Sequence, residues 1–193
     1  MALIYGVGYN SKTFFKKREA DGSSKAYTCW RGILRRCYNE KERYKYPTYT
    51  GVSICDEWKD FQNFAKWFYH NYNNIMKDWV LDKDILVKGN KIYSPETCCF
   101  VPQEVNKLFI KTDRSRGIYP IGVFKLGNRY VVQLSKSSNK SKHISCESTP
   151  ENAFEVYKAV KEQYIKEIAD KWKELIGFRV YQAMYNYQVE ITD

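Results

Sequence analysis

Apolar residues recur at helical spacing in two stretches of the first half of the chain. The first stretch places four apolar residues at the i, i+3, i+4, i+7 positions of one helical face: Trp30, Ile33, Leu34 and Cys37. The second, over residues 57–72, carries a mainly aromatic stripe: Trp58, Phe61, Phe64, Ala65 and Phe68. Stripes of this kind are far more often core than base-stacking surface, so we predict two helices that bury these faces.

Residues 81–106 predict two short strands that close onto a helix. Polar and apolar residues alternate over residues 81–87, as expected of a strand, and residues 88–91 carry turn residues. The apolar run 98–101 predicts the second strand. Pro102 then suits the first position of a helix, because its missing N–H would have had no partner there.

A second group of elements follows a charged segment at residues 111–117. Residues 122–125 and 129–134 flank a Gly-Asn turn and predict a hairpin, and residues 143–146 predict a third strand. The sequence Ser-Thr-Pro-Glu at 148–151 is a strong helix start, with a capping hydroxyl and a proline in the first turn. After this helix, we expect a short helix or an extended strap.

The pattern therefore predicts an α+β protein in four segments. Residues 1–26 form a basic arm, residues 27–112 a first domain, residues 113–172 a second domain and residues 173–193 a tail. A chain of 193 residues with 44% hydrophobic residues is large enough for one large domain or two small ones. No run approaches the roughly 18 apolar residues of a membrane span, so we expect no membrane contact and a cytoplasmic location.

The six cysteines contain no C-x-x-C pair, which favours buried thiols in a reducing compartment. A structural zinc bound by Cys37, Cys55 and either Cys98 or Cys99 is the alternative. The irregular spacing of these cysteines argues against such a site.

The net charge of +10 is concentrated near the N-terminus, since residues 1–45 hold eleven Lys or Arg against four Asp or Glu. Such a face binds a phosphate backbone without reading its sequence, because binding releases condensed counterions. An ordinary solubilising surface is the alternative. The interleaved tyrosines favour nucleic acid, and the basic residues that lie off the first helical stripe are the expected contacts: Arg31, Arg35 and Arg36.

The order of these motifs resembles the HNH endonuclease family, in the version common among phage and homing-type nucleases. Residues 30–37 read WRGILRRC where the family has W-x-x-(I/M)-x-x-R-C, and residues 55–61 read CDEWKDF where it has Cys-x-x-Trp-x-x-Phe. Residues 93–106, YSPETCCFVPQEVN, are similar to its Y-x-P-E-N-x-x-W-x-T-x-x-x-N run, with Phe100 in place of the Trp. The resemblance covers residues 27–112.

This resemblance implies a ββα domain around one divalent cation, Mg²⁺ or a similar ion, that hydrolyses phosphodiesters in DNA, with nicking as the expected outcome. By the family's motif, Asp82 and Asn106 are metal ligands and Asn90 is the Asn of the hairpin connection. Hard oxygen ligands suit such an ion. The cytoplasm of a phage's host cell is then the expected location.

Lys83 stands where the family has its general-base His. An imidazole with a pKa of about 6.5 can deprotonate water near neutral pH, whereas a lysine with a pKa of about 10.4 stays protonated unless its surroundings disfavour the charge. Lys83 is therefore a poor base, although an ammonium can neutralise a phosphate. The alternative function is a catalytically silent phage DNA-binding or host-interference protein that retains the HNH scaffold.

Neither His70 nor His143 lies in the hairpin, and His70 fits a structural role on its aromatic helix. Without the resemblance, Asp82 and Asp84 would fit a solvated strand edge equally well. Whether the chain is an enzyme therefore stays open from the sequence.

Residues 113–172 resemble the ethylene-response-factor (APETALA-type) DNA-binding domain, which has three strands and one helix. Its G-V, R-W-x-A-x-I and T-x-E-x-A-x-x-A-Y phrases match residues 122–123, 129–134 and 149–157, with Tyr130 in place of the Trp.

The second resemblance implies that the strands enter the major groove of double-stranded DNA, which is wide enough for a β-ribbon. The strand residues nearest the bases would be Lys125, Arg129 and Gln133. A small α+β packing module is the alternative. The target sequence and the oligomeric state are left open by the sequence.

Overall fold

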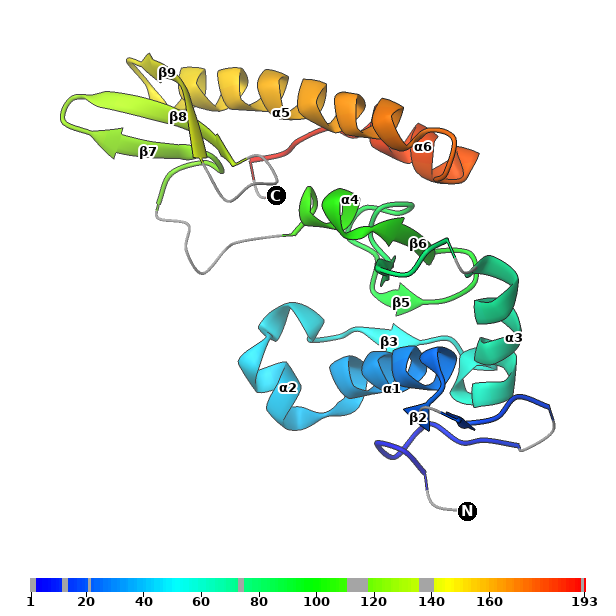
Figure 1. The fold of residues 1–193 in the computed structure, drawn as a ribbon. Coiled ribbons are helices and arrows are strands. Elements are labelled where there is room, and N and C mark those ends of the chain that lie inside the picture. The colour runs from blue at the N-terminus through cyan, green and yellow to red at the C-terminus, as the bar shows by residue number, and fades with distance from the viewer. Residues whose placement is uncertain are drawn as a thin grey trace. The chain divides into compact units, whose positions relative to one another are not determined.

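A computed structural model describes residues 3–11, 14–20, 22–72, 75–110, 118–135, 141–191 and 193, which divide into two compact units (Figure 1). Unit 1 is Met1–Val101 and unit 2 is Pro102–Asp193, so residues 102–110, which we grouped with the first domain, belong to the second unit. The described residues are 42% helical and 22% strand, which places the chain in the mixed class that the sequence predicts. None of the described helices is both long and apolar enough to cross a membrane.

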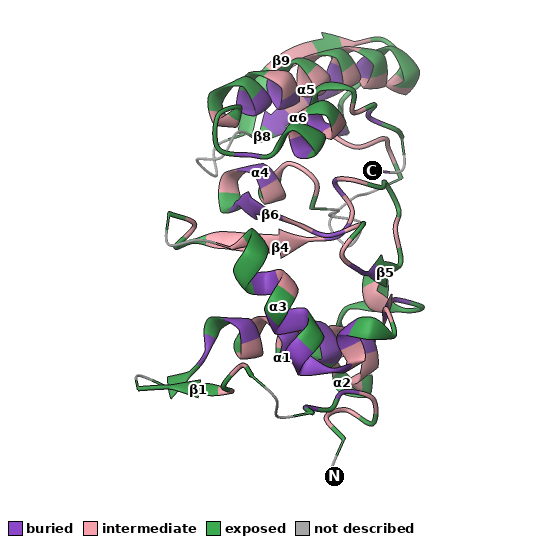
Figure 2. Cartoon of the chain, turned by 90° about the vertical axis from the view of Figure 1, so that its right-hand side faces the viewer, coloured by how far each residue is buried: buried purple, intermediate pink, exposed green. Residues whose placement is uncertain are grey.

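The first predicted stripe forms α1 (Lys25–Tyr38), with Trp30, Ile33, Leu34 and Cys37 all buried. The helix begins where Ser24 caps it, because the Ser24 hydroxyl accepts a hydrogen bond from the backbone N–H of Tyr27. Asn39 ends α1 and caps the short helix α2 (Glu40–Lys45), which leads into the 3₁₀ turn η1 (Pro47–Tyr49). Figure 2 shows buried residues of α1 near those of α3 (Phe61–Asn71), the helix that α1 contacts.

The second stripe is broken in two, so the single helix predicted over residues 57–72 is wrong at its first turn. A 3₁₀ turn, η2 (Glu57–Lys59), precedes α3 (Phe61–Asn71). Between them Asp60 has extended backbone, and its carboxylate caps α3 by accepting the N–H of Gln62. The aromatic side chains of both pieces still enter one core, where the indole N–H of Trp30 donates to the carbonyl of Trp58 at 2.7 Å.

The N-terminal segment packs onto this core. Tyr9 bridges to the start of α3 through bonds with the backbone of Lys59 and Phe61, and β1 (Arg18–Glu19) pairs with β2 (Gly22–Ser23). Gly8 lies against α1 so closely that any Cβ would overlap Trp30 and Leu34. The described part of the predicted basic arm is therefore an integral layer of unit 1.

Unit 1 contains very short strands. β3 (Ser53–Ile54) pairs in parallel with β5 (Ile92–Tyr93), and β4 (Trp79–Asp82) forms a two-stranded sheet with β6 (Cys99–Pro102). The strand predicted over residues 81–87 is wrong after Asp82, because the chain bends there.

Unit 2 begins with the short helix α4 (Gln103–Lys107), for which Pro102 is the N-cap residue and not the first helical residue. The predicted hairpin and third strand are present as one antiparallel sheet of β7 (Val123–Leu126), β8 (Arg129–Ser135) and β9 (Ser141–Glu147). The predicted helix start is also present: Thr149 caps α5 (Pro150–Trp172) by accepting the N–H of Asn152. The tail contains α6 (Phe178–Tyr185).

Helix α5 packs along one face of the three-stranded sheet (Figure 1). Gly122, just before β7, adopts φ +73° and lies directly under the ring of Tyr157, where a Cβ would overlap that ring. Both conditions require glycine, because L-residues rarely adopt positive φ. This close approach joins the start of the sheet to the middle of α5.

Candidate functional site

The predicted metal ligand Asp82 ends β4 and holds the loop that follows. Its Oδ1 accepts hydrogen bonds from the backbone N–H groups of Asp84 at 2.7 Å and Ile85 at 2.8 Å. This is an Asx turn, which offers the backbone an alternative to continuing the strand. Burial raises the pKa of the Asp82 carboxyl, and the two N–H groups oppose that rise.

Lys83 points into the same loop and is 8% exposed. Its Nζ lies 2.6 and 2.7 Å from the two carboxylate oxygens of Asp84 and 2.6 Å from the backbone oxygen of Asn90. The three donors of an ammonium are matched here by three acceptors, so the charge is compensated where it is buried. Nothing in this arrangement directs the amine toward an attacking water.

Asn90 closes the other side of the loop. Its Nδ2 donates to the carbonyls of Lys83 at 2.8 Å and Ile92 at 2.7 Å, and its Oδ1 accepts the N–H of Ile92 at 3.1 Å. One amide thus ties residue 83 to residue 92 across the connection. Asp82, Lys83 and Asn90, which the resemblance assigns to metal binding and catalysis, here form one hydrogen-bonded framework, which we call the loop framework.

The fourth predicted residue, Asn106, belongs to α4 of unit 2, whereas the loop framework belongs to unit 1. Among the residues that the structure describes, no group of three or more His, Cys, Asp and Glu side chains is placed to hold a metal ion. Around Asp82 the donor set is one carboxylate whose Oδ1 already accepts two N–H groups, beside an ammonium. One carboxylate is the kind of hard oxygen ligand that Mg²⁺ takes together with several waters.

The cysteines considered for zinc do not assemble into such a group either, within the described residues. Burial raises the pKa of the thiols of Cys37 to about 11 and of Cys98 to about 12, which favours the protonated form. None of the six cysteines, all of which lie in the described part of the chain, forms a disulfide.

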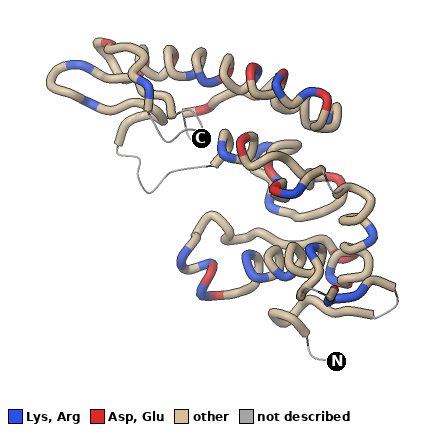
Figure 3. The backbone as a smooth tube through the Cα atoms, viewed as in Figure 1, with Lys and Arg blue, Asp and Glu red and all other residues tan. Residues whose placement is uncertain are grey.

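The three predicted arginines of α1 divide into two kinds. Arg31 and Arg35 are exposed, and Lys and Arg recur along α1 and α2 (Figure 3). Arg36 instead turns inward: its Nε donates to the hydroxyl of Tyr93 at 3.2 Å, and its guanidinium lies 5.6 Å from the centre of that ring. Arg36 therefore joins α1 to β5, and the solvent-facing positive charge comes from the other two arginines.

The register of the three-stranded sheet separates the residues predicted to approach DNA. Lys125 pairs with Tyr130, and neighbouring positions on a strand point to opposite faces, so Lys125 faces away from Arg129 and Gln133. The three residues predicted to lie nearest the bases therefore do not all share one face of the sheet. The sequence contains a signal for this separation. The two-residue turn after Leu126 fixes which residues of β7 and β8 pair, and so which side chains share a face.

The face with Arg129 is the one that α5 leaves open. Arg129 is exposed and its Nη2 donates to the carbonyl of Cys146 on β9 at 2.8 Å. Exposed apolar side chains stand on the same face at Phe124 and Leu126, and His143 lies 3.3 Å from the thiol of Cys146. The face is therefore mixed apolar and basic.

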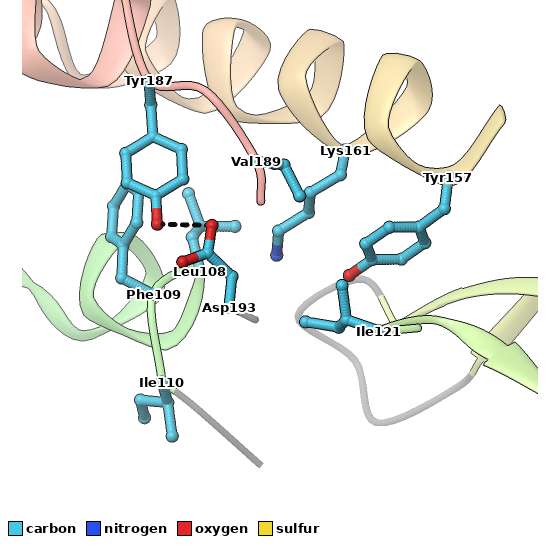
Figure 4. Close-up of a pocket in the computed structure, with 9 residues that line it drawn as sticks. All are labelled: Leu108, Phe109, Ile110, Ile121, Tyr157, Lys161, Tyr187, Val189 and Asp193. Carbon is cyan, nitrogen blue, oxygen red and sulfur yellow. Dashed lines mark hydrogen bonds between the residues drawn. The ribbon is translucent and has the colours of Figure 1, made fainter. Parts of the chain in front are cut away.

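Lys161, which the sequence analysis did not single out, lines a small cavity in unit 2 with room for about one water molecule, near 20 Å³ (Figure 4). Burial lowers its pKa to about 8, and the carboxylate of Asp193 opposes that fall. Asp193 holds the last residues in place by accepting the Tyr187 hydroxyl at 3.1 Å and the N–H of Glu190 at 2.9 Å. The sequence could not single out Lys161, because no pattern marks a lysine on a helix as buried.

Comparison with models of protein families, with curated proteins and with solved structures gives no match for this chain.

Proposed function

We propose that this chain is a double-stranded DNA-binding protein on an HNH-like scaffold, in which the loop framework supports the fold and does not cleave DNA. The observation that carries the proposal is the environment of Lys83, whose Nζ is held by Asp84 and by the carbonyl of Asn90. At the position of the family's general base there is thus a compensated, buried charge.

Binding itself is supported by the distribution of positive charge. The chain carries a net charge of +10, and two arginines of α1 are exposed on one side of unit 1. In unit 2 the open face of the sheet carries both Arg129 and Gln133, side chains with the donors and acceptors that base edges require. Exposed arginines are thus available in each unit for contacts to a phosphate backbone.

The test measures binding and cleavage by the full-length chain. We expect fluorescence anisotropy with a short DNA duplex to give saturable binding that weakens with salt, and supercoiled plasmid to stay intact with Mg²⁺ or Mn²⁺. Absence of duplex binding at low salt would contradict the proposal.

The structural role of the loop is tested by Lys83→Met. We expect this variant to lose about 1–3 kcal/mol of unfolding free energy in urea, because Asp84 and the Asn90 carbonyl lose their partner. Lys66→Met, at an exposed position of α3, is the matched control and should change stability by less than about 0.5 kcal/mol. Equal stability of the two variants would remove the argument for a framework.

A metal-dependent nuclease is the second candidate function, and the raised pKa of Asp82 favours it, because perturbed acids concentrate at catalytic sites. If the wild type nicks plasmid with a divalent cation and Asp82→Asn does not, this second function is correct and the first is not. Lys83→His then serves to ask whether the family's base improves the rate.

A further inference from the structure

A groove of about 270 Å³ runs along the exposed side of α1 in unit 1. Among the residues that the structure describes, its walls carry hydroxyl and guanidinium groups and no acidic side chain: Tyr5, Ser23, Tyr27, Thr28, Arg31, Gly32 and Arg35. The lining comes from the N-terminal turn, from β2 and from two successive turns of the helix. Hydroxyls and arginines without carboxylates make a lining that suits an anion.

Arg31 and Arg35 are one helical turn apart, so their side chains lie next to one another along the groove. The guanidinium of Arg31 lies 5.8 Å from the ring centre of Tyr27, which restrains its orientation. Arg35 makes an ion pair with Glu42 at 3.8 Å in which the Arg35 side chain remains 54% exposed. Such a long, exposed pair is worth little, so a phosphate can replace it.

Gly32 lies between the two arginines in the middle of α1. Glycine inside a helix costs about 1 kcal/mol relative to alanine. No packing reason offsets this cost, because a Cβ at Gly32 would meet only the Arg36 Nη1, at an ordinary 3.6 Å. The missing side chain instead keeps the floor of the groove open between the two guanidinium groups.

Tyr5 has φ +52° and is the one non-glycine residue with positive φ in the described part of the chain. A bulky residue in this conformation is uncommon and needs its surroundings to hold it. Ile4 and Gly8 do so by exchanging two backbone hydrogen bonds of 2.7 and 2.9 Å around the turn. The strained turn places Tyr5 in the lining of the groove, where the residue also packs against the edge of the unit 1 core.

We propose that this groove seats one phosphate of the DNA backbone, bracketed by Arg31 and Arg35 over the open floor at Gly32, with Tyr5 beside the adjoining sugar. The inference rests on the proposed function and adds to it a defined contact. It differs from general attraction to a basic surface in one respect: the shape of the groove matters as well as its charge.

The test compares variants that change the shape or the charge, using anisotropy with a short DNA duplex over a series of salt concentrations. Gly32→Gln leaves the net charge unchanged and fills the floor. We expect it to reduce the steepness of log K against log salt by about 0.9, the amount for one lost phosphate contact, and to weaken binding about tenfold at low salt. Arg31→Gln with Arg35→Gln should reduce the steepness by at least as much.

Three further variants separate the possible outcomes. Lys66→Gln removes one charge outside the groove and should change the affinity by less than the double arginine variant. Gly32→Ala should raise the melting temperature, which shows that weaker binding by Gly32 variants does not come from unfolding. Glu42→Gln should tighten binding, because it releases Arg35.

Duplex binding with an unchanged salt dependence in Gly32→Gln overturns the phosphate seat and leaves the proposed function intact. Absence of any duplex binding by the wild type overturns both. Saturable binding of inorganic phosphate alone at micromolar concentration also overturns the inference, because the groove would then be a site for a free phosphate compound and not for a polymer backbone.

Discussion

Single side chains in this protein are placed by the polar groups around them more than by their own chemical type. Lys83 and Arg36 are both cations that sequence patterns assign to solvent or to DNA, yet each is drawn inward by acceptors on another segment. Lys161 has fewer partners: burial lowers its pKa to about 8, with Asp193 opposing. These three residues show that buried cations need their partners identified before a function is assigned.

Lys161 should therefore make stability depend on pH in a defined window. Its pKa in the folded chain is about 8, below the ordinary 10.5, so between these values the unfolded chain keeps a proton that the folded chain has released. Rising pH then favours the folded state across this window. We expect the melting temperature of the wild type, minus that of Lys161→Met, to increase from pH 8 to about pH 10.5.

Subtracting the melting temperature of Lys161→Met from that of the wild type removes the contribution of other groups that titrate in the same pH range, such as buried thiols. Lys142→Met, at an exposed position of β9, supplies the control and should give a flat difference. A flat difference for Lys161→Met as well would mean that this amine is as well solvated in the folded chain as in the unfolded one.

At the scale of elements, the periodic patterns predict where helices and strands lie but not where polar side chains interrupt them. The α1 stripe, the three-stranded sheet and the Thr149 cap follow from spacing and turn residues. The breaks at Asp60 and Asp82 do not, because a carboxylate can either face solvent or bond backbone N–H groups nearby, and the tertiary surroundings decide.

The candidate site is predicted less well than the fold. Motif spacing identifies the loop of Asp82, Lys83 and Asn90 as unusual, and the structure joins these residues. Most of their partners are backbone carbonyls and N–H groups, which every residue has and which a sequence motif therefore cannot mark. The groove at Gly32 depends on Tyr5, a residue far away in sequence, so no local pattern could reveal it.

The contact between Gly122 and α5 gives a prediction for the packing of helix on sheet. Gly122→Ala should lose about 2–5 kcal/mol of unfolding free energy, because it combines positive φ with overlap on the Tyr157 ring. Gly127→Ala, in the β7–β8 turn at φ +58° with nothing within 4 Å, should lose only about 1–2 kcal/mol. Urea unfolding of both variants measures the difference, and equal losses would contradict the close approach.

At the scale of the whole molecule, the positive charge is shared between the two compact units. Of the 32 Lys and Arg residues, 17 belong to unit 1 and 15 to unit 2, and each unit has 11 of the 22 acids. Each unit therefore has a net positive charge of its own. The proposed contacts divide in the same way, with the groove of α1 in unit 1 and the open sheet face in unit 2.

This division predicts that the two sets of contacts contribute independently to DNA binding. We expect Arg31→Gln with Arg35→Gln to lower affinity for all duplexes, and Arg129→Ala to relax sequence preference by about 1–3 kcal/mol. Because the residues belong to separate compact units, the losses in a combined variant should add within about 0.5 kcal/mol. Anisotropy with a selected and a random duplex measures both the loss of general affinity and the loss of sequence preference.

Coupling well above that value would mean that the two units act on DNA as a single surface. Lys125→Ala is the control for the sheet, since Lys125 faces away from Arg129 and should leave sequence preference unchanged.

The Gln62 side chain sets an order of events during synthesis of the chain. Its amide accepts the N–H groups of Phe14 and Phe15 and donates to Asn10 and to the carbonyl of Phe15. These bonds span about 50 residues, which a ribosome adds in roughly 3–10 s. Until Gln62 emerges, the nascent N-terminal segment must satisfy its backbone with water, so this layer of unit 1 is completed only after α1 has left the ribosome.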